Sequence, residues 1–429
     1  MKRQRPLHII TLGCAKNLVD SERLINQLSL GGLDITHGDT PVPAHTTILN
    51  TCAFIADAKE ESVDMILDLV QAKKRGETET IIVFGCLSQR YKEQLREEIP
   101  EVDHFFGCDD LNQMLEVLHT PLFGEQLYQR RLTTPSHYAY LKVSEGCNRK
   151  CAFCIIPSIR GAYTSTPIDE LMREAQFLGE QGVKELLLVA QDLSSYGTDI
   201  NQHLKTLLTE LETINGIEWI RLHYAYPSGF PTEIIPVMAA SEKIVPYLDI
   251  PFQHASDNLL KAMRRGHTAK QNHDIINRLR KEIPHIALRT TLITGFPGET
   301  EDDYRILSDF VQEVQFDRLG VFPFSAEEGT HAATLPDDIP QKLKEERAEA
   351  IMEIQESISF EKNQTYINRV VDVITDRREG ELLIGRTKAD SPEVDQEVII
   401  RNAPGIQEGA IIPVQIEDAA PFDLYGTPA

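Results

Sequence analysis

Two hydrophobic patterns alternate along the first third of the chain. Short apolar runs predict strands, and the stretch after each run has apolar residues near helical spacing. The predicted strands are Leu7–Leu12, Thr46–Leu49 and Thr80–Phe84, and the predicted helices are Val19–Leu30, Ala56–Lys74 and Gln89–Glu98. Strands that alternate with helices predict an α/β domain over residues 5–120, in which an open parallel sheet carries helices on both faces.

The same alternation resumes after a short joint that contains Pro and Thr residues, Leu132–Pro135. Six further strands are predicted at Tyr138–Val143, Glu185–Ala190, Trp219–Tyr224, Val245–Ile250, Ala287–Ile293 and Arg318–Phe322, with helical patterns that include Ile168–Glu180, Leu204–Ile214 and Gln271–Glu282. Six βα units in about 190 residues suit a partial or full TIM-like (β/α) barrel better than a doubly wound sheet. With a charge-rich connector helix over Lys342–Phe360, this predicted central domain covers residues 133–362.

The pattern changes again in the last part of the chain, where short strands are separated by turn residues. The predicted strands are Val370–Ile374, Glu381–Arg386, Glu397–Ile400 and Ile411–Ile416. They predict a small antiparallel β-barrel over residues 363–429.

Length and composition fit a folded protein of several domains. The chain has 429 residues, of which 41% are hydrophobic and 25% charged, and a domain-sized length of about 150 residues gives about three domains. No apolar stretch is long enough for a conventional membrane-spanning helix, and no signal peptide is visible, so we expect a cytoplasmic protein with no membrane partner. Seven cysteines in a reducing compartment indicate metal or redox chemistry.

The charge balance is strongly acidic. Lys and Arg number 43 and Asp and Glu number 66, which gives a formal net charge of −23. A field of this sign repels phosphate backbones and favours basic partners, although a small basic patch could still bind RNA.

Three cysteines, named here the loop trio, lie directly after the first strand of the predicted barrel: Cys147, Cys151 and Cys154. Their spacing suits three corners of a cubane iron–sulfur cluster, which takes soft, deprotonated sulfur donors. The missing fourth thiolate would leave one iron open to bind a substrate. A structural zinc site with a distant fourth ligand is the alternative, although zinc normally takes paired Cys-x-x-Cys or Cys/His sets.

Three other cysteines, named here the edge trio, each follow a predicted strand of the first domain: Cys14, Cys52 and Cys86. Ligands gather at the carboxyl ends of parallel strands, so these thiols could converge despite their separation in sequence. Three buried cysteines are the alternative, since cysteine is common in cores. The repeated placement favours a second cluster. Cys108 is left over and is interpreted as an inert or partly buried thiol.

The sequence around both trios resembles a known family. The segment Ser144–Pro157, followed by Arg160 and Gly161, is similar to the cluster loop of the radical S-adenosylmethionine (SAM) methylthiotransferases. The segment Thr11–Glu22 is similar to the N-terminal signature of that family. Its Lys-Asn and Val-Asp-Ser-Glu pattern resembles the branch that modifies a ribosomal protein, the RimO type, whereas the tRNA-modifying branch tends to carry Gln-Met-Asn. The resemblance spans a methylthiotransferase N-terminal domain, a radical-SAM partial barrel and a C-terminal TRAM domain.

The resemblance implies an enzyme with two 4Fe–4S clusters and SAM as cofactors. The loop trio would hold the cluster that binds SAM, and an electron passed through it would cleave SAM to a 5′-deoxyadenosyl radical. The radical is expected to remove hydrogen from the β-carbon of an aspartate in the twelfth protein of the small ribosomal subunit. The edge trio would hold the auxiliary cluster with the sulfur to be transferred, a second SAM would supply the methyl group, and an external electron donor and a sulfur donor are implied partners.

Three side chains next to the loop trio have alternative interpretations. Phe153 could shield the cluster or simply pack in the core. Lys142 and Arg160 could contact SAM or the substrate, but a solvated charge is the simpler expectation for each.

The predicted strand ends of the barrel supply three more candidates. The segment Leu292–Glu299 resembles the glycine-containing SAM-side segment of the superfamily, although a tight turn would also require its glycines. The segment Asp249–Gln253 ends a barrel strand, and this position alone places Asp249 and Gln253 on the expected site face. The histidines form no metal-spaced set.

The C-terminal unit bears on the substrate. Residues 363–429 contain 6 Lys and Arg against 12 Asp and Glu, a balance of −6. An acidic barrel is a poor phosphate clamp, and a basic ribosomal protein, free or in the small subunit, is the better electrostatic match. Solvating carboxylates with no partner are the alternative. Two other functions stay open: the same reaction on tRNA adenosine, and a non-catalytic iron–sulfur protein that binds the ribosome.

Overall fold

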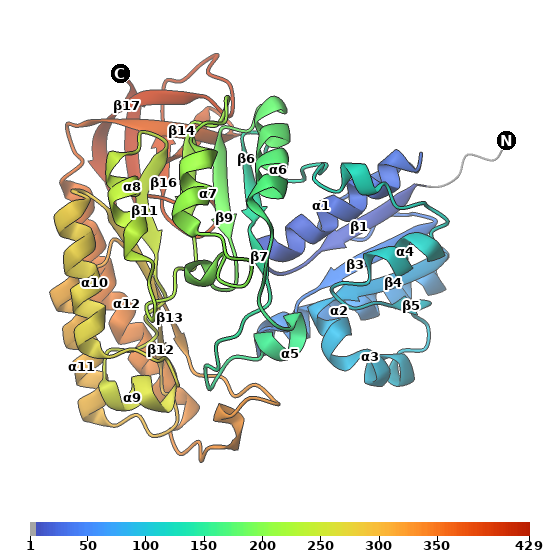
Figure 1. Ribbon diagram of the computed structural model, residues 1–429, viewed down its shortest axis with the longest axis horizontal. Coiled ribbons are helices and arrows are strands. Elements are labelled where there is room, and N and C mark those ends of the chain that lie inside the picture. The colour runs from blue at the N-terminus through green and yellow to red at the C-terminus, as the bar shows by residue number, and fades with distance from the viewer. Residues whose placement is uncertain (1–5) are drawn as a thin grey trace.

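The computed structural model describes residues 6–429, whose strands form three large sheets and one two-stranded pair (Figure 1). The N-terminal α/β domain lies beside the central domain, and the C-terminal barrel covers one end of the central sheet. Arg5, where the first domain was expected to begin, lies outside the described residues. No helix in residues 6–429 has the length and apolar character that a membrane crossing requires.

The N-terminal domain is a parallel sheet with strand order β2-β1-β3-β4-β5, which confirms the predicted open parallel sheet. Its elements are β1 (Leu7–Thr11), α1 (Ala15–Leu30), β2 (Ile35–His37), β3 (Thr46–Thr51), α2 (Ala56–Lys74), β4 (Thr80–Gly85), α3 (Cys86–Glu98), β5 (His104–Phe105) and α4 (Leu111–Val117). The pattern did not predict β2, β5 and α4, because elements this short carry too few periodic positions.

The central domain is a six-stranded sheet with order β13-β12-β11-β10-β9-β6, and every recorded pairing in it is parallel. An open sheet of this order confirms the partial barrel. Its strands are β6 (Tyr138–Lys142), β9 (Glu185–Val189), β10 (Trp219–Leu222), β11 (Ile244–Asp249), β12 (Ala287–Thr294) and β13 (Arg318–Pro323); its helices are α5 (Ile156–Arg160), α6 (Ile168–Glu180), α7 (Leu204–Leu211), α8 (Ile235–Ala240), α9 (Asp257–Ala262), α10 (Ala269–Glu282) and α11 (Glu301–Val314). A small pair, β7 (Ser144–Glu145) and β8 (Thr164–Ser165), flanks the loop trio.

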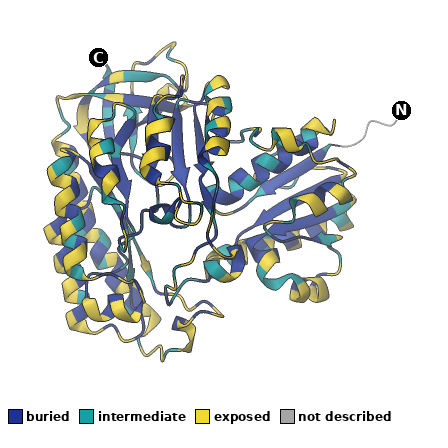
Figure 2. Ribbon diagram, in the orientation of Figure 1, coloured by how far each residue is buried: buried dark blue, intermediate teal, exposed yellow. Residues whose placement is uncertain are grey.

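Alternate positions of each central strand face opposite ways. Ala139, Leu141, Leu186 and Leu188 join the core beneath the helices, whereas Tyr138, Tyr140, Leu187 and Val189 face the other side and contact α1. Strands β6 and β9 are therefore buried on both faces, while the outer surfaces of the helices are exposed (Figure 2).

The predicted connector is the longest helix, α12 (Gln341–Gln364). This helix joins the central domain to the barrel, as predicted, and it also packs in the core of the central domain. Its buried residues Ile351 and Ile358 belong to the same apolar core as the central strands.

The C-terminal domain is a closed five-stranded barrel with order β14-β15-β16-β18-β17. Its strands are β14 (Val370–Glu379), β15 (Leu382–Thr387), β16 (Glu397–Ile400), β17 (Ile411–Ala419) and β18 (Asp423–Pro428). The prediction was an antiparallel barrel of four strands. The observed barrel is mixed, because a fifth strand, β18, closes it by pairing in parallel with β16.

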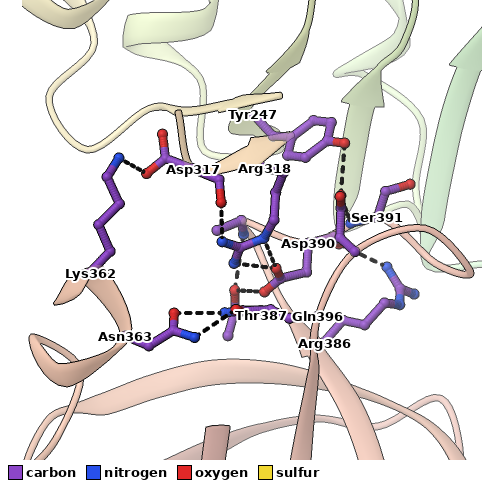
Figure 3. A network of polar contacts seen from close by, with 12 residues as sticks. Tyr247, Asp317, Arg318, Lys362, Asn363, Arg386, Thr387, Asp390, Ser391 and Gln396 are labelled. Atoms are coloured by element: carbon purple, nitrogen blue, oxygen red, sulfur yellow. Dashed lines mark hydrogen bonds and ion pairs between the residues drawn. The ribbon is translucent and has the colours of Figure 1, made fainter. Parts of the chain in front are cut away.

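Ion pairs and hydrogen bonds fasten the barrel to the central domain (Figure 3). Arg318 donates to the buried carboxylate of Asp390 at 2.7 Å, and Tyr247 donates to Asp395 at 2.8 Å. Beside these contacts, Lys362 at the end of α12 pairs with Asp317 of the same domain at 2.6 Å. Several carboxylates that the sequence suggested for a partner's surface thus bind the protein's own central domain.

Candidate active site

The loop trio lies in a tight loop between β7 and α5. The backbone N–H of Cys154 donates to the carbonyl of Cys151 at 3.2 Å, and that of Cys147 donates to the carbonyl of Gly161 at 3.2 Å. The Ala152 N–H donates to the Met263 carbonyl at 2.9 Å, which fixes the loop to the turn after α9. The backbone therefore brings the three thiols to one end of the central sheet.

Hydrogen-bond donors surround the sulfur atoms of the loop trio. The Arg265 guanidinium donates to Cys151 Sγ at 3.2 Å, and the Tyr226 hydroxyl lies 3.3 Å from the same sulfur. The backbone N–H of Arg149 donates to Cys147 Sγ at 3.4 Å. Donors of this kind stabilise thiolate charge, as iron–sulfur ligands require.

Burial opposes that charge while the thiols are free. Burial is the main reason that the pKa of Cys147 is raised and that of Cys154 reaches about 12, and charge on neighbouring thiols of the trio adds to both shifts. Ionisation of the trio is therefore coupled to the arrival of iron, whose positive charge favours the thiolates. The residues fit a cluster with three protein ligands.

The edge trio gathers at the carboxyl ends of three parallel strands. Cys14 caps α1 after β1, Cys52 follows β3, and Cys86 begins α3 after β4. A Cβ atom on Gly13 would lie 2.7 Å from Cys52 Cβ, so glycine is needed for this close approach. The charges of Cys14 and Cys86 add to the burial that raises the pKa of Cys52 to about 11.

Exposure separates the edge trio from ordinary core cysteines. Cys52 and Cys86 are buried, but Cys14 is exposed, so the alternative of three buried cysteines does not hold. In residues 6–429 no three His, Cys, Asp or Glu side chains are placed to hold a single metal ion. In a cubane, by contrast, each thiolate binds its own iron.

Cys108 lies beside Cys86, a contact that the sequence did not reveal. Hydrogen bonding with Cys108 and the nearby Arg160 guanidinium lower the pKa of Cys86 to about 6, while the same contact raises the pKa of Cys108. Cys108 follows β5, one of the two strands of this sheet that were too short to be predicted. It is partly buried, as expected.

A buried ion-pair network joins the N-terminal domain to the loop trio. Arg160 donates to Asp20 at 2.8 Å, to Glu145 at 3.1 Å and to Asn17 Oδ1 at 2.5 Å. Lys142 also pairs with Asp20 and Glu145. Burial alone would raise the pKa of Glu145, but the two cations outweigh it and hold that pKa at about 2. The expectation of solvated charges at Lys142 and Arg160 was wrong, because tertiary packing buries both.

Unpaired acceptors lie at neighbouring strand ends near the loop trio. Gln253 Oε1, Gln191 Oε1 and Asp192 Oδ1 are buried and have no hydrogen-bond partner. Tyr224 and Gln253 adopt positive φ angles of 60° and 72° after β10 and β11, a strained conformation that is typical of functional sites. A cosubstrate rich in donors, such as the ammonium, ribose and adenine groups of SAM, would satisfy these acceptors.

The remaining candidates from the sequence have structural partners. Asp249 is buried and pairs with Arg289 at 3.2 Å. Phe153 packs against an apolar cluster that includes Phe296 and Phe324. Gly295 has a φ of +72°, and a Cβ there would lie 2.2 Å from Lys344 of α12, so a turn and a close helix contact explain this glycine.

Sequence reasoning missed several residues at the site. Arg265 and Tyr226 contact Cys151 of the loop trio, and Tyr224 lies near Lys16 and Cys14, all from distant parts of the chain that no local motif marks. Lys16 differs from these residues, because it lies inside the N-terminal signature, two residues after Cys14. Its position in the sequence could have marked it as a site residue.

Family models match each of the three domains. Residues 6–107 match Uncharacterized protein family UPF0004, residues 141–311 match the Radical SAM superfamily, and residues 367–428 match the TRAM domain. These matches follow the order of the three sheets.

Full-length relatives are similar across the whole chain. The ribosomal protein uS12 methylthiotransferase RimO of Christiangramia forsetii is 48% identical and is matched over 100% of this chain and 95% of its own length. The proteins of the same name from Flavobacterium johnsoniae and Bacteroides fragilis are 47% and 48% identical, and each is covered over 99% of its length, with 100% and 99% of this chain matched.

Solved structures share the fold at low sequence identity. The radical SAM methyltransferase TsrM from Kitasatospora setae, with cobalamin and a [4Fe-4S] cluster bound, has a TM-score of 0.55 at 16% identity, covering 75% of each chain. The cobalamin-dependent SAM radical enzyme OxsB has a TM-score of 0.51 at 14% identity, over 83% of this chain and 56% of its own.

Proposed function

Because this chain belongs to the family of ribosomal protein uS12 methylthiotransferases, we propose that it adds a methylthio group to uS12, at the β-carbon of an aspartate. It is a radical SAM methylthiotransferase by family. The observation that carries the proposal is the convergence of two separate cysteine trios at one domain junction, joined by the Arg160 network.

In the proposal, each trio holds one 4Fe–4S cluster. The loop trio is assigned the SAM-binding cluster, and the edge trio the auxiliary cluster next to the sulfur to be transferred. When bound, the clusters and SAM supply one-electron chemistry that can activate an unreactive carbon. An external electron donor and a sulfur donor are required, and we place the reaction in the cytoplasm.

The chain's own residues orient the cluster ligands, offer acceptors to SAM and shield the site from water. Arg265 and Tyr226 hold the Cys151 sulfur in position, and unpaired Gln191 and Gln253 acceptors are available to SAM. The docked N-terminal domain, through Val19, packs on the inner face of the central sheet and so limits the access of water to the site.

The substrate is tested by offering both candidates to one enzyme. Anaerobically purified protein is incubated with SAM, reductant and either uS12 or tRNA, and products are searched for the mass of one methylthio group. Modified uS12 is expected; modification of tRNA alone would overturn the choice of substrate, and release of no deoxyadenosine would favour the non-catalytic binding protein.

Cysteine variants test the two assignments separately. Cys147→Ala is expected to abolish SAM cleavage, whereas Cys52→Ala should retain cleavage and lose sulfur insertion. Iron analysis should give about eight irons per chain for the unmodified protein and about four for either variant. Full insertion by Cys52→Ala would refute the auxiliary cluster.

A further inference from the structure

Lys16, the second residue of α1, carries a buried ammonium group that makes no ion pair within residues 6–429, although Cys14 and Glu145 lie near enough to raise its pKa. Its exposed fraction is 9%. Within residues 6–429 no ion pair or hydrogen bond joins its Nζ to a carboxylate, and the Nζ atom lies over the face of the Tyr224 ring, 4.2 Å from the ring centroid. A buried charge with no acidic group in direct contact is costly, so this ammonium favours the close approach of a further anion.

The position of Lys16 joins the two halves of the site. It lies two residues after Cys14 of the edge trio, and Tyr224 follows β10 at the carboxyl end of the central sheet. Its neighbours Ala15 and Leu18 pack on the sheet face opposite the helices. The ammonium therefore stands between the edge trio and the strand ends that carry the unpaired acceptors.

The other cations near the trios already have partners. Arg160 and Lys142 pair with Asp20 and Glu145, Arg149 pairs with Asp192, Arg289 pairs with Asp249 and Asp395, and Arg265 donates to Cys151 Sγ and the Pro251 carbonyl. An incoming anion would have to break an existing ion pair at any of the carboxylate-bound cations. Lys16 can accept one with no such cost.

We propose that Lys16 binds the side-chain carboxylate of the target aspartate of uS12, an inference that rests on the proposed function. The basic side chains of uS12 are repelled by the ammonium of Lys16. The target aspartate of uS12 is attracted to it, because its carboxylate is negatively charged. The Tyr224 ring stabilises the cation from behind, and burial strengthens its attraction for a carboxylate. Lys16 thus selects an acidic side chain and holds its β-carbon beside the edge trio.

A double-mutant cycle tests this contact through binding alone. The holoenzyme and its Lys16→Met and Lys16→Arg variants are titrated, without reductant, with uS12 and with uS12 whose target aspartate is changed to asparagine. Lys16→Met is expected to weaken binding of uS12 about tenfold, since a hydrogen bond to a charged group is lost. It should leave binding of the asparagine form unchanged, and Lys16→Arg should restore most of the affinity.

The matched control is Lys205→Met, the same change at an exposed lysine of α7, which should alter neither titration. Equal weakening of both uS12 forms by Lys16→Met, or no weakening, would overturn the proposal. The proposal would also be overturned if Lys16→Met lost iron or sulfide from the edge trio alone, because the anion that Lys16 binds would then be sulfur at that trio. Failure of the unmodified enzyme to modify uS12 would instead refute the proposed function.

Discussion

At the residue scale, two thiols of one trio have opposite acid–base properties. Hydrogen bonding with Cys108 and the charge of Arg160 lower the pKa of Cys86 to about 6, whereas burial raises that of Cys52 to about 11. Thiolates, not thiols, bind iron. Cys86 therefore gives up its proton to bind iron more readily than Cys52, which must lose its proton as the metal arrives.

Cys108 is expected to be a neighbour of the edge trio and not a ligand. The groups that shift the pKa of Cys108 are Cys86, Arg160 and Asp20, whereas Cys14 and Cys86 shift the pKa of Cys52. Cys108 therefore lies on the side of Cys86 that faces Arg160. Cys108→Ser should retain about eight irons per chain, whereas Cys52→Ser should retain about four. Iron and acid-labile sulfide analysis checks both, and about four irons in Cys108→Ser would make Cys108 a ligand.

At the element scale, α5 and α1 form the joint between the two chemical centres. The loop trio leads into α5, whose Ile159 packs with residues of the N-terminal domain, and whose Arg160 reaches Asp20 and Asn17 of α1. Asn17 Oδ1 also lies 3.7 Å from Cys86 Sγ. A shift of either helix would therefore move one trio relative to the other.

Loss of Arg160 should weaken this joint. Arg160→Met leaves Asp20 and Glu145 with Lys142 as their shared cation, so we expect a loss of about 3 kcal/mol, the lower end for a broken buried ion pair. Hydrogen exchange of α1 amides measures it, and faster exchange is expected. Arg173→Met, at an exposed ion pair of α6, is the control. Unchanged exchange of α1 in Arg160→Met would show that apolar contacts alone hold the joint.

At the scale of the whole molecule, the acidic barrel uses part of its charge internally. Asp390 and Asp395 bind Arg318 and Arg289 of the central domain, and Asp376 binds Arg386 within the barrel. The count of −6 for this domain thus overstates the carboxylates free to meet a basic partner. Exposed acids such as Glu381 and Glu408 remain available.

Asp390 should matter for the attachment of the barrel. Asp390→Ala leaves the Arg318 guanidinium buried without its counter-ion, which is expected to cost about 3–5 kcal/mol. Hydrogen exchange in β15 and β16 should rise, and thermal unfolding should begin earlier. Glu381→Ala, at an exposed acid of the same domain, should change neither. Equal protection of both strands in Asp390→Ala would mean that the barrel is held by other contacts.

The sequence by itself determined the local elements and the chemistry. The long strands and helices, the three domain types and the six cysteines follow from periodicity and spacing, because these depend on neighbours along the chain. The family was also readable, since both signatures are short and continuous. The expected boundaries of the three domains and the assignment of each trio to a cluster stay predictions.

Only the tertiary structure decided which distant groups meet. It placed Arg265 on Cys151, Cys108 beside Cys86 and Lys16 over Tyr224, and it turned Arg160 from an expected solvated charge into a buried link. It also added β18 in parallel to the barrel. Burial and ion pairing depend on how separate elements pack, and that packing leaves no periodic trace in the sequence.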